Sequence, residues 1–391
     1  MKIARIFVGD ANNQKGKFNN VIERIKHLNI IDEFKSDNYL IQYRYSTSFK
    51  LLKPIKNKIT NTKYTDIDNV KLTNIFVKIS LLDYLMVHVF KLKALECNKS
   101  LNNFIPLFEN YDIITTHDLP SSFLAFKINK RYNIPFTITW HGSDINKYPF
   151  RSKKTYSLIR LLLNNSFHNF FVSKALQSAS ELICNSKNKS VLYSGPADRF
   201  YKKNDCDIQK LKIKFGVKTD KVVGFIGNLE PIKNVLSLPK IFEIIQKNSI
   251  SQVSFLIIGD GKLEKHLKKN VDILNIQNVF FMGKLFPEVI PNYLNIFDIL
   301  ILPSINEGMP RVILEAQACG VQTLASNVGG ISEVISEEYI FPLNQDFESN
   351  IANKAIDLLK KNHTKVQLDE KFSWKNTISN ETKIYKLATK Y

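Results

Sequence analysis

The sequence is poor in cysteine and in long apolar runs. Four cysteines stand among 391 residues, and none forms the Cys-x-x-Cys pair of zinc or redox sites. This excludes a disulfide framework and favours a reducing, cytoplasmic compartment. No apolar run reaches the ~18 residues of a membrane-spanning helix. The apolar run at the N-terminus is too short for a signal peptide and predicts a first strand.

Several enzyme signatures are also absent. The chain has no His-Glu-x-x-His motif, no Gly-x-Ser-x-Gly nucleophile elbow and no phosphate-binding P-loop. Two acidic triplets, residues 66–68 and 205–207, imitate the carboxylates of metal-dependent sugar transfer, but neither follows an apolar strand. We interpret both as loop carboxylates and expect no metal site.

Negative charge is scarce in the first half. Residues 1–200 carry 30 Lys and Arg against 15 Asp and Glu, a net +15, whereas residues 201–391 carry 25 against 21, a net +4. Such a field suits nucleic acid, an anionic membrane or an anionic substrate. Because no nucleic-acid motif accompanies the charge, a basic nucleic-acid-binding protein is only a remote alternative.

Short apolar runs alternate with helix-like segments from end to end, which predicts an α/β protein with parallel sheets covered on both faces. The chain is too long for one core. Two successive arrays predict two doubly wound domains, residues 1–200 and 201–373, with an amphipathic helix at about 374–391. The joint is expected near residues 194–207.

Ligands of such folds bind beyond the carboxyl ends of the strands. The candidates at predicted strand ends are Gly9, Asp10, Thr116, His117, Asp118, His141, Gly142, Ser143, Asp144, Gly227, Asn228, Gly259, Asp260, Gly261, Gly283, Glu307 and Gly308. Most have a structural alternative: a buried histidine for His117 and His141, a tight turn for the Gly-x-Gly of residues 259–261.

The segment "EGMPRVILEA" places Glu307 before a predicted helix start and Glu315 inside the helix. Pro310 suits a first helical turn, and Gly308 permits close backbone approach. The free amides there favour a phosphate, and the two carboxylates can accept hydrogen bonds from hydroxyls. Lys233, after the strand that Gly227 ends, can reach a diphosphate. Solvated surface charges are the alternative for all three side chains.

These motifs resemble the retaining glycosyltransferases of the GT-B fold, glycosyltransferase family 4. The resemblance rests on "GFIGNLEPIKN", "FLIIGDGKLEKHL", "NVFFMGKL" and the segment from "FDILILPS" to "SEVI". The first half matches more loosely, through "HDLPSSFLAF" and "TWHGSD". The resemblance implies two Rossmann-like domains that face each other across a cleft, the first on the acceptor side, and a closing helix that crosses back to the first domain.

The resemblance also implies residue roles. Glu307 would contact the donor sugar, Glu315 the ribose, and Lys233 the diphosphate, with His141 near the reacting sugar. The implied catalytic set is His141, Lys233 and Glu307. The implied donor-binding set is Gly227, Asn228, Lys233, Lys284, Leu285, Glu307, Gly308, Met309, Pro310, Arg311 and Glu315, and the implied acceptor-side set is Gly16, His117 and Asp118. Asn228 stands where the family usually has arginine.

The implied reaction is transfer of a sugar from a nucleotide diphosphate sugar to a glycan or lipid-linked acceptor, with retained anomeric configuration, no metal and no cofactor. The implied setting is bacterial surface polysaccharide, lipopolysaccharide or teichoic-type glycan synthesis. We expect peripheral association with the inner face of the plasma membrane through the basic first half. A nucleotide-sugar 2-epimerase of the same fold is the alternative.

Overall fold

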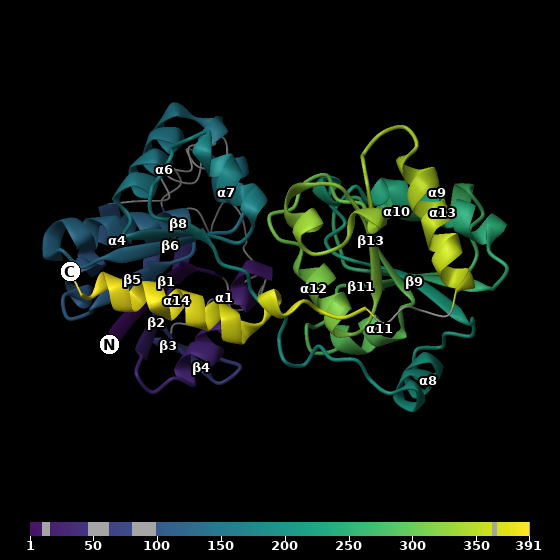
Figure 1. Cartoon of the computed structure of the whole chain (residues 1–391), viewed down its shortest axis with the longest axis horizontal. Helices are drawn as coiled ribbons and strands as arrows, with labels where there is room; N and C mark the ends of the chain where they lie inside the picture. Colours follow the sequence, from purple (N-terminus) through teal and green to yellow (C-terminus); the bar gives the residue numbers. More distant parts are fainter. Residues whose placement is uncertain (10–15, 46–61, 80–98, 362–365, 391) are drawn as a thin grey trace. The chain divides into compact units, whose positions relative to one another are not determined.

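The computed structural model describes residues 1–9, 16–45, 62–79, 99–361 and 366–390. The chain divides into two compact units, Met1–Ser194 with Ser373–Tyr391 and Gly195–Phe372 (Figure 1). Each unit contains one sheet with helices between successive strands. The predicted strand-end residue Asp10 lies outside the described residues.

The sheet of the first unit has the strand order β3-β4-β2-β1-β5-β6-β7-β8. Its strands are β1 (Lys2–Val8), β2 (Lys35–Tyr45), β3 (Tyr64–Ile67), β4 (Val70–Ile79), β5 (Ile113–Thr116), β6 (Phe136–Trp140), β7 (His168–Phe171) and β8 (Lys189–Val191). Neighbouring strands are parallel except for β3 and β4.

The antiparallel β3–β4 hairpin was not predicted from the sequence. It turns at Asp68 and Asn69, whose φ angles are 48° and 64°, as a two-residue type I′ turn requires. The interpretation of residues 66–68 as loop carboxylates is therefore wrong for Asp66, which lies in β3. The other triplet also differs, since residues 205–207 form the first turn of helix α8 (Asp205–Lys214).

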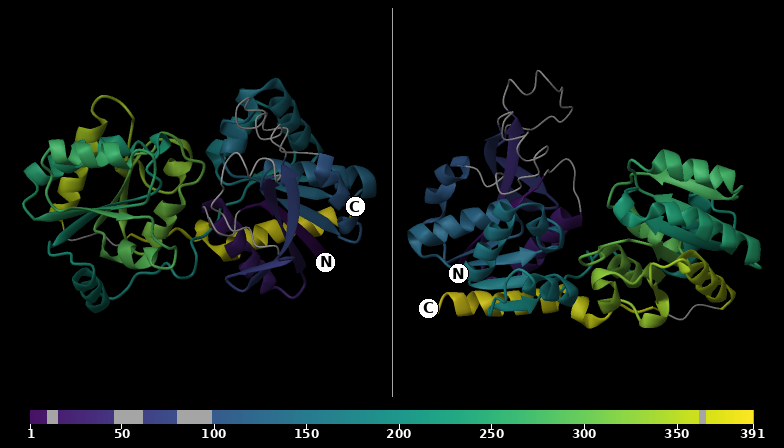
Figure 2. Two further views of the ribbon diagram at one scale, coloured as in Figure 1. Left: turned by 180° about the vertical axis from the view of Figure 1, so that it is seen from behind. Right: turned by 90° about the horizontal axis from the view of Figure 1, so that it is seen from above.

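The predicted closing helix belongs to the first unit. The helices of this unit are α1 (Gly16–Asn29), α4 (Leu119–Tyr132), α5 (Ser143–Asn146), α6 (Lys153–Asn165), α7 (Lys174–Glu181) and α14 (Trp374–Ala388), with 3-10 helices at Lys99–Phe108 and Pro149–Arg151. Figure 2 shows α14 running along this unit. Ile378 and Tyr385 of α14 pack in one apolar cluster with Ile3 and Ile113, so the last helix completes a core that the first strand begins.

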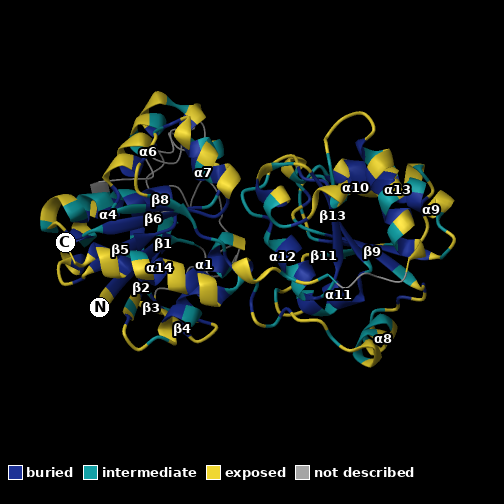
Figure 3. Cartoon of the chain, in the orientation of Figure 1, coloured by how far each residue is buried: buried dark blue, intermediate teal, exposed yellow. Residues whose placement is uncertain are grey.

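The sheet of the second unit has the order β11-β10-β9-β12-β13-β14, and all its strand pairs are parallel. The strands are β9 (Lys221–Ile226), β10 (Val253–Ile258), β11 (Val279–Gly283), β12 (Ile299–Leu302), β13 (Gln322–Ser326) and β14 (Ile340–Phe341). Besides α8, the helices are α9 (Leu238–Asn248), α10 (Glu264–Ile273), α11 (Ile290–Ile296), α12 (Arg311–Ala318) and α13 (Phe347–Lys360). The central strands β10, β12 and β13 are buried throughout, whereas the edge strands β11 and β14 are only partly buried. Figure 3 shows the outer helix faces as exposed, as a doubly wound sheet requires.

The partly buried His168 of β7 predicts acid sensitivity. Burial lowers the pKa of His168 to about 4, whereas the unfolded chain protonates near pH 6.5. Between these values the unfolded state binds more protons, so the free energy of unfolding falls as the pH drops from about 6.5 to about 4. We expect His168→Gln to reduce this fall by about 1–3 kcal/mol. Urea unfolding at pH 7 and pH 4.5 measures it, with exposed His266→Gln as the control; an unchanged pH dependence in His168→Gln contradicts the prediction.

Candidate active site

Lys233 and Glu307 form an ion pair in the second unit. Lys233 Nζ lies 2.5 Å from Glu307 Oε1, and Ser304 Oγ donates a hydrogen bond to the same oxygen at 2.7 Å. The Lys233 side chain is 22% exposed and that of Glu307 is 11% exposed. Because both are mostly shielded from water, their mutual attraction is stronger than that of a surface pair.

The ion pair lies where the strand order of the sheet reverses. β9 precedes Lys233 and β12 precedes Glu307, and these neighbouring strands have their partners β10 and β13 on opposite sides. Ligands of open parallel sheets bind at this reversal, beyond the carboxyl ends of the strands. The two loops are also tied together, since Ile305 N donates to Ile232 O at 2.8 Å.

Gly329 lies directly against the backbone of Glu307. Its φ angle is +56°, and a Cβ at this position would lie 1.8 Å from the carbonyl oxygen of Glu307. Ser326, at the end of β13, donates from its hydroxyl to Ser304 O. The βα loops after β12 and β13 therefore fix the backbone that carries the Glu307 carboxylate.

The Gly-x-Gly of residues 259–261 has a structural cause. A Cβ on Gly259 would lie 1.9 Å from Gly227 O, and one on Gly261 would lie 2.4 Å from Leu229 O. Hydrogen bonds from Gly227 N to Ile258 O and from Leu229 N to Asp260 O join the same segments. Both glycines thus allow the loop after β10 to support the loop after β9.

Glu315 lies in α12 with its carboxylate near cationic side chains. Its Oε1 is 3.7 Å from Arg311 Nη2, and the Glu315 side chain is 17% exposed. Burial raises the pKa of Glu315, while the charges of Arg311 and Arg199 act in the opposite direction. Arg311, whose backbone was predicted at the phosphate, therefore has its side chain beside the second glutamate.

The start of α12 suits an anionic group. Gly308 and Met309 are partly exposed, and Pro310 occupies the N-cap position, where it makes no side-chain capping bond. The sequence analysis placed Pro310 in the first turn, and the structure places it one residue earlier. Uncapped amides at a helix start attract negative charge.

Three further predicted donor residues lie at the same edge of the sheet. Asn228 is exposed directly after β9. Lys284 and Leu285 follow β11, which β10 separates from β9. Leu285 packs against an apolar cluster, while Lys284 is exposed.

The predicted residues of the first unit have unequal surroundings. His117 is fully buried, and its Nδ1 lies 3.4 Å from Nε2 of the partly exposed His141. Asp118 caps α4 by accepting from Ser121 N at 3.1 Å, and it accepts from Val8 N at 2.7 Å. Asp118 therefore anchors the strand and helix ends, and Gly16 begins α1.

Residues 207–373 match the family described as glycosyl transferases group 1. This segment is less than half of the chain, and it carries the similarity to that family. The chain is 26% identical over 228 residues to the putative teichuronic acid biosynthesis glycosyltransferase TuaC of Bacillus subtilis, a match that covers 58% of this chain and 56% of that relative. It is 29% identical to the UDP-Gal:alpha-D-GlcNAc-diphosphoundecaprenol alpha-1,3-galactosyltransferase of Escherichia coli, over 68% of this chain and 74% of that enzyme.

Nearly the whole chain resembles solved structures in fold. Anabaena Alr3699/HepE in complex with UDP superposes with a TM-score of 0.75 at 19% identity, over 99% of this chain and 100% of that chain. Sucrose-phosphate synthase from Thermosynechococcus elongatus has the same TM-score at 17% identity, over 99% and 98%. The predicted GT-B fold is thereby confirmed. The group 1 match and the relatives named as glycosyltransferases identify the chain as a transferase of class EC 2.4.

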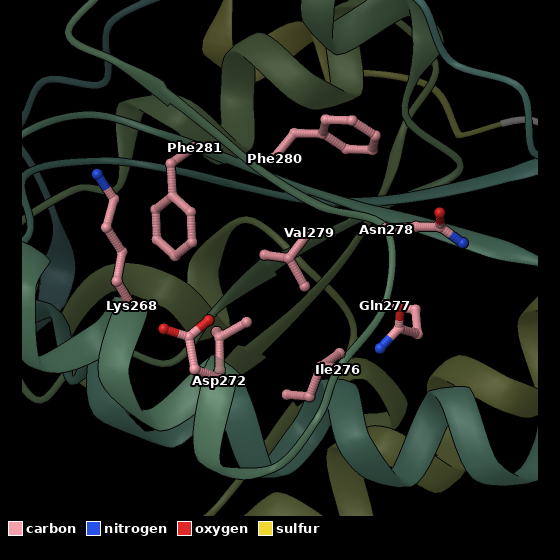
Figure 4. A pocket seen from close by; sticks show the side chains of 9 residues that line it. Lys268, Asp272, Ile276, Gln277, Asn278, Val279, Phe280 and Phe281 are labelled. Atoms are coloured by element: carbon pink, nitrogen blue, oxygen red, sulfur yellow. The ribbon is translucent and has the colours of Figure 1, made fainter.

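A surface depression of about 490 Å³ lies elsewhere in the glycosyltransferase (Figure 4). It is lined by Lys268, Val271, Asp272, Ile276, Gln277, Asn278, Val279, Phe280 and Phe281. These residues come from α10, from the loop that follows it and from the beginning of β11, whereas the predicted donor residues follow the carboxyl ends of strands. The depression is therefore separate from the candidate site.

Two features are absent from the described part of the chain. No described helix combines the length and apolar character needed to cross a bilayer. Over the same residues, no group of three or more His, Cys, Asp or Glu side chains is placed to hold a metal ion.

Some residues that contact the predicted site residues were not predicted from the sequence. Ser304 contacts the Glu307 carboxylate, and its only sequence signal is a serine just after the end of β12. Arg199 influences Glu315 from more than one hundred positions earlier in the chain. The direct pairing of Lys233 with Glu307 was also missed, because each had been assigned to the ligand alone.

Gly329→Ala tests whether the Glu307 loop is part of the donor site. The new Cβ and the positive φ should displace Glu307, cost about 1–3 kcal/mol of stability and abolish the rise in Tm that a nucleotide sugar produces. Gly216→Ala is the matched control, because Gly216 has a φ of +70° but no atom within 4 Å of its Cβ position. Differential scanning fluorimetry with a nucleotide-sugar panel measures both, and an unchanged ligand-dependent shift in Gly329→Ala contradicts the assignment.

Proposed function

We propose that this chain transfers a sugar from a nucleotide diphosphate sugar to a glycan or lipid-linked acceptor of bacterial surface polysaccharide synthesis, with retention of configuration and without a metal ion. The carrying observation is the Lys233–Glu307 ion pair at the strand-order reversal of the group 1 domain. The named functions of TuaC and of the Escherichia coli galactosyltransferase support this setting.

The chemical problem in this reaction is the charge of the departing diphosphate. Lys233 has three donors, one of which contacts Glu307, so others remain for phosphate oxygens. The uncapped start of α12 adds oriented amides. Together these groups would stabilise negative charge as it develops, which is where fixed electrostatics contribute most to a rate.

The glutamates are proposed to bind hydroxyl groups rather than to act as an acid and a base. One oxygen of Glu307 already accepts hydrogen bonds from Lys233 and Ser304, which leaves the other oxygen for a ligand hydroxyl. We assign Glu307 to the donor sugar and Glu315 to the ribose. With no carboxylate assigned as nucleophile, retention would follow from attack on the same face as the leaving diphosphate, whose oxygen takes the acceptor proton.

Further roles remain proposals from the resemblance. In the second unit these are the contacts of Gly227, Asn228, Lys284 and Leu285 with the donor. In the first unit we propose that His141 contacts the reacting sugar and that Gly16 lies on the acceptor side. The group 1 match favours transfer over the 2-epimerase alternative and over nucleic-acid binding.

Glu315→Ala should weaken donor binding at least tenfold, because a hydrogen bond to a charged group contributes about 1.5–3 kcal/mol. At 100 times its Kd a donor adds about 2.7 kcal/mol to the wild-type stability, and this increment should shrink. Glu264→Ala, which removes a surface glutamate paired with Lys268, should leave it unchanged. Isothermal titration with the donor found by the screen decides, and unchanged affinity in Glu315→Ala would sink the ribose assignment.

The first unit carries a surface that supports membrane attachment. Residues 145–180 contain six Lys or Arg and no Asp or Glu. Lys153, Lys154 and Arg160 are exposed on α6, where Leu161 is 38% exposed and the preceding Phe150 is 63% exposed. Basic residues beside exposed apolar ones suit an anionic bilayer surface. We propose that this face attaches the enzyme to the inner leaflet.

Reversing the charge of Lys153, Lys154 and Arg160 to glutamate should weaken binding to phosphatidylglycerol vesicles about 100-fold, since each contributes about 1 kcal/mol near an anionic surface. The control reverses Lys210, Lys212 and Lys214 of α8, which changes the net charge equally. Vesicle co-sedimentation at low and high salt measures both. Equal losses in the two variants, or no binding by the wild type at low salt, would remove the proposal.

A further inference from the structure

A buried ionic cluster joins the first strand, the first helix and the last helix of the first unit. Arg5, Arg24 and Glu381 are all fully buried. Glu381 Oε1 lies 3.4 Å from Arg5 Nη1 and 3.6 Å from Arg24 Nη1, and the Tyr385 hydroxyl donates to the same oxygen. Although burial alone would raise it, the two guanidinium charges hold the pKa of Glu381 below its usual value.

The cluster costs free energy, because two buried cations face one buried anion and each ion has lost its hydration. Replacing such a cluster by apolar side chains often leaves stability unchanged or raises it. Packing alone therefore gives no reason for these residues. Arg5 has one further contact outside the cluster, and that contact is with His117, a predicted site residue of the same unit.

Arg5 Nη1 lies 3.0 Å from Nε2 of His117. A guanidinium can only donate, so Nε2 of His117 must accept. An imidazole that accepts at Nε2 is neutral and carries its proton on Nδ1. Independently, burial and the nearby charges of Arg24 and Arg5 place the pKa of His117 well below its usual value, which also requires the neutral ring.

The proton on His117 Nδ1 faces the second histidine. Nδ1 lies 3.4 Å from Nε2 of His141, and the two residues follow β5 and β6, adjacent parallel strands whose carboxyl ends share one edge. If His117 donates, then Nε2 of His141 accepts, and His141 carries its own proton on Nδ1.

We propose that Glu381, Arg5 and His117 are positioning residues that hold His141 in its Nδ1–H tautomer. The direction of each hydrogen bond is set by the one before it: the carboxylate fixes the guanidinium, the guanidinium fixes His117, and His117 fixes His141. The last helix of the chain thus controls which nitrogen of a proposed site residue carries a proton. The tautomer itself does not depend on the proposed function, whereas its effect on turnover does.

Other charged groups around His117 do not alter the direction of these hydrogen bonds. Lys17 and Arg24 add positive charge near the ring, which also opposes its protonation. Asp118, the adjacent carboxylate, is held by Val8 N, Ser121 N and Lys17 Nζ. The ring of Phe7 meets His117 edge-on with centroids 6.4 Å apart.

Two substitutions of His117 separate its two contacts. His117→Asn retains an amide donor near the position of Nδ1 but loses the group that Arg5 contacts. His117→Gln retains an acceptor near the position of Nε2 but loses the donor to His141. Arg5→Met removes the donor that fixes the ring of His117. Circular dichroism and Tm show which variants fold. If Arg5→Met does not fold, the comparison of His117→Asn with His117→Gln still tests the proposal.

The test is ¹⁵N-histidine NMR of the full chain at pH 7.5, with His141 assigned from His141→Gln. We expect wild type and His117→Asn to show His141 protonated on Nδ1, and His117→Gln and Arg5→Met to show mixed tautomers. An Nε2–H signal from wild-type His141, or an unchanged signal in His117→Gln, overturns the proposal.

Turnover separates this proposal from the proposed function. If His141 acts in the reaction, His117→Gln should lower kcat about tenfold or more with little change in the donor KM, and His117→Asn should restore most of it. If His141→Gln retains full transfer while His117→Gln shifts the His141 tautomer as expected, the proposed role of His141 in the reaction is wrong. The positioning of His141 by Glu381, Arg5 and His117 then stands.

Discussion

The proposed chemistry of this glycosyltransferase depends on the ion pair between Lys233 and Glu307. It joins the loops after two neighbouring strands at the one position where the strand order reverses. The surrounding glycines and serines are understandable as the means of holding that pair: Gly329 admits the Glu307 backbone, and Ser304 occupies the same carboxylate oxygen. A lysine held beside a carboxylate is kept out of bulk water and in one place, so little rearrangement is needed when an anionic ligand arrives.

Much of the fold was predictable because its signal is local. Apolar runs that end in glycine or polar residues identified most strands, and parallel pairing then fixed the edge at which Lys233 and Glu307 lie. The β3–β4 hairpin was missed because its turn is Asp68–Asn69 rather than the Asn-Gly or Asp-Gly pairs that favour a type I′ turn. A tight turn was the structural alternative for the Gly-x-Gly of residues 259–261. The reason that glycine is needed there is the close approach of the Gly227 and Leu229 carbonyls, which only the structure shows.

The contacts that define the site escaped prediction for a different reason. Lys233 and Glu307 are 74 positions apart, and Arg5 and Glu381 are 376 apart. Composition and periodicity do not show which charged residues far apart in the sequence come into contact. A single sequence therefore shows an excess of lysine and arginine but not which of these side chains form ion pairs. Only the folded arrangement separates the paired Arg5 and Lys233 from the basic face of α6.

The contacts between β1 and α14 also affect the order in which the first unit can fold during synthesis. Arg5 and Arg24 are translated long before Glu381, the carboxylate that both approach in the folded unit. Since domains generally fold as they leave the ribosome, the contacts of α14 with Ile3 and Ile113 can form only once this helix has emerged. The core of this unit is therefore completed only after α14 has been translated, and a chain truncated before α14 leaves exposed the apolar side chains that this helix covers.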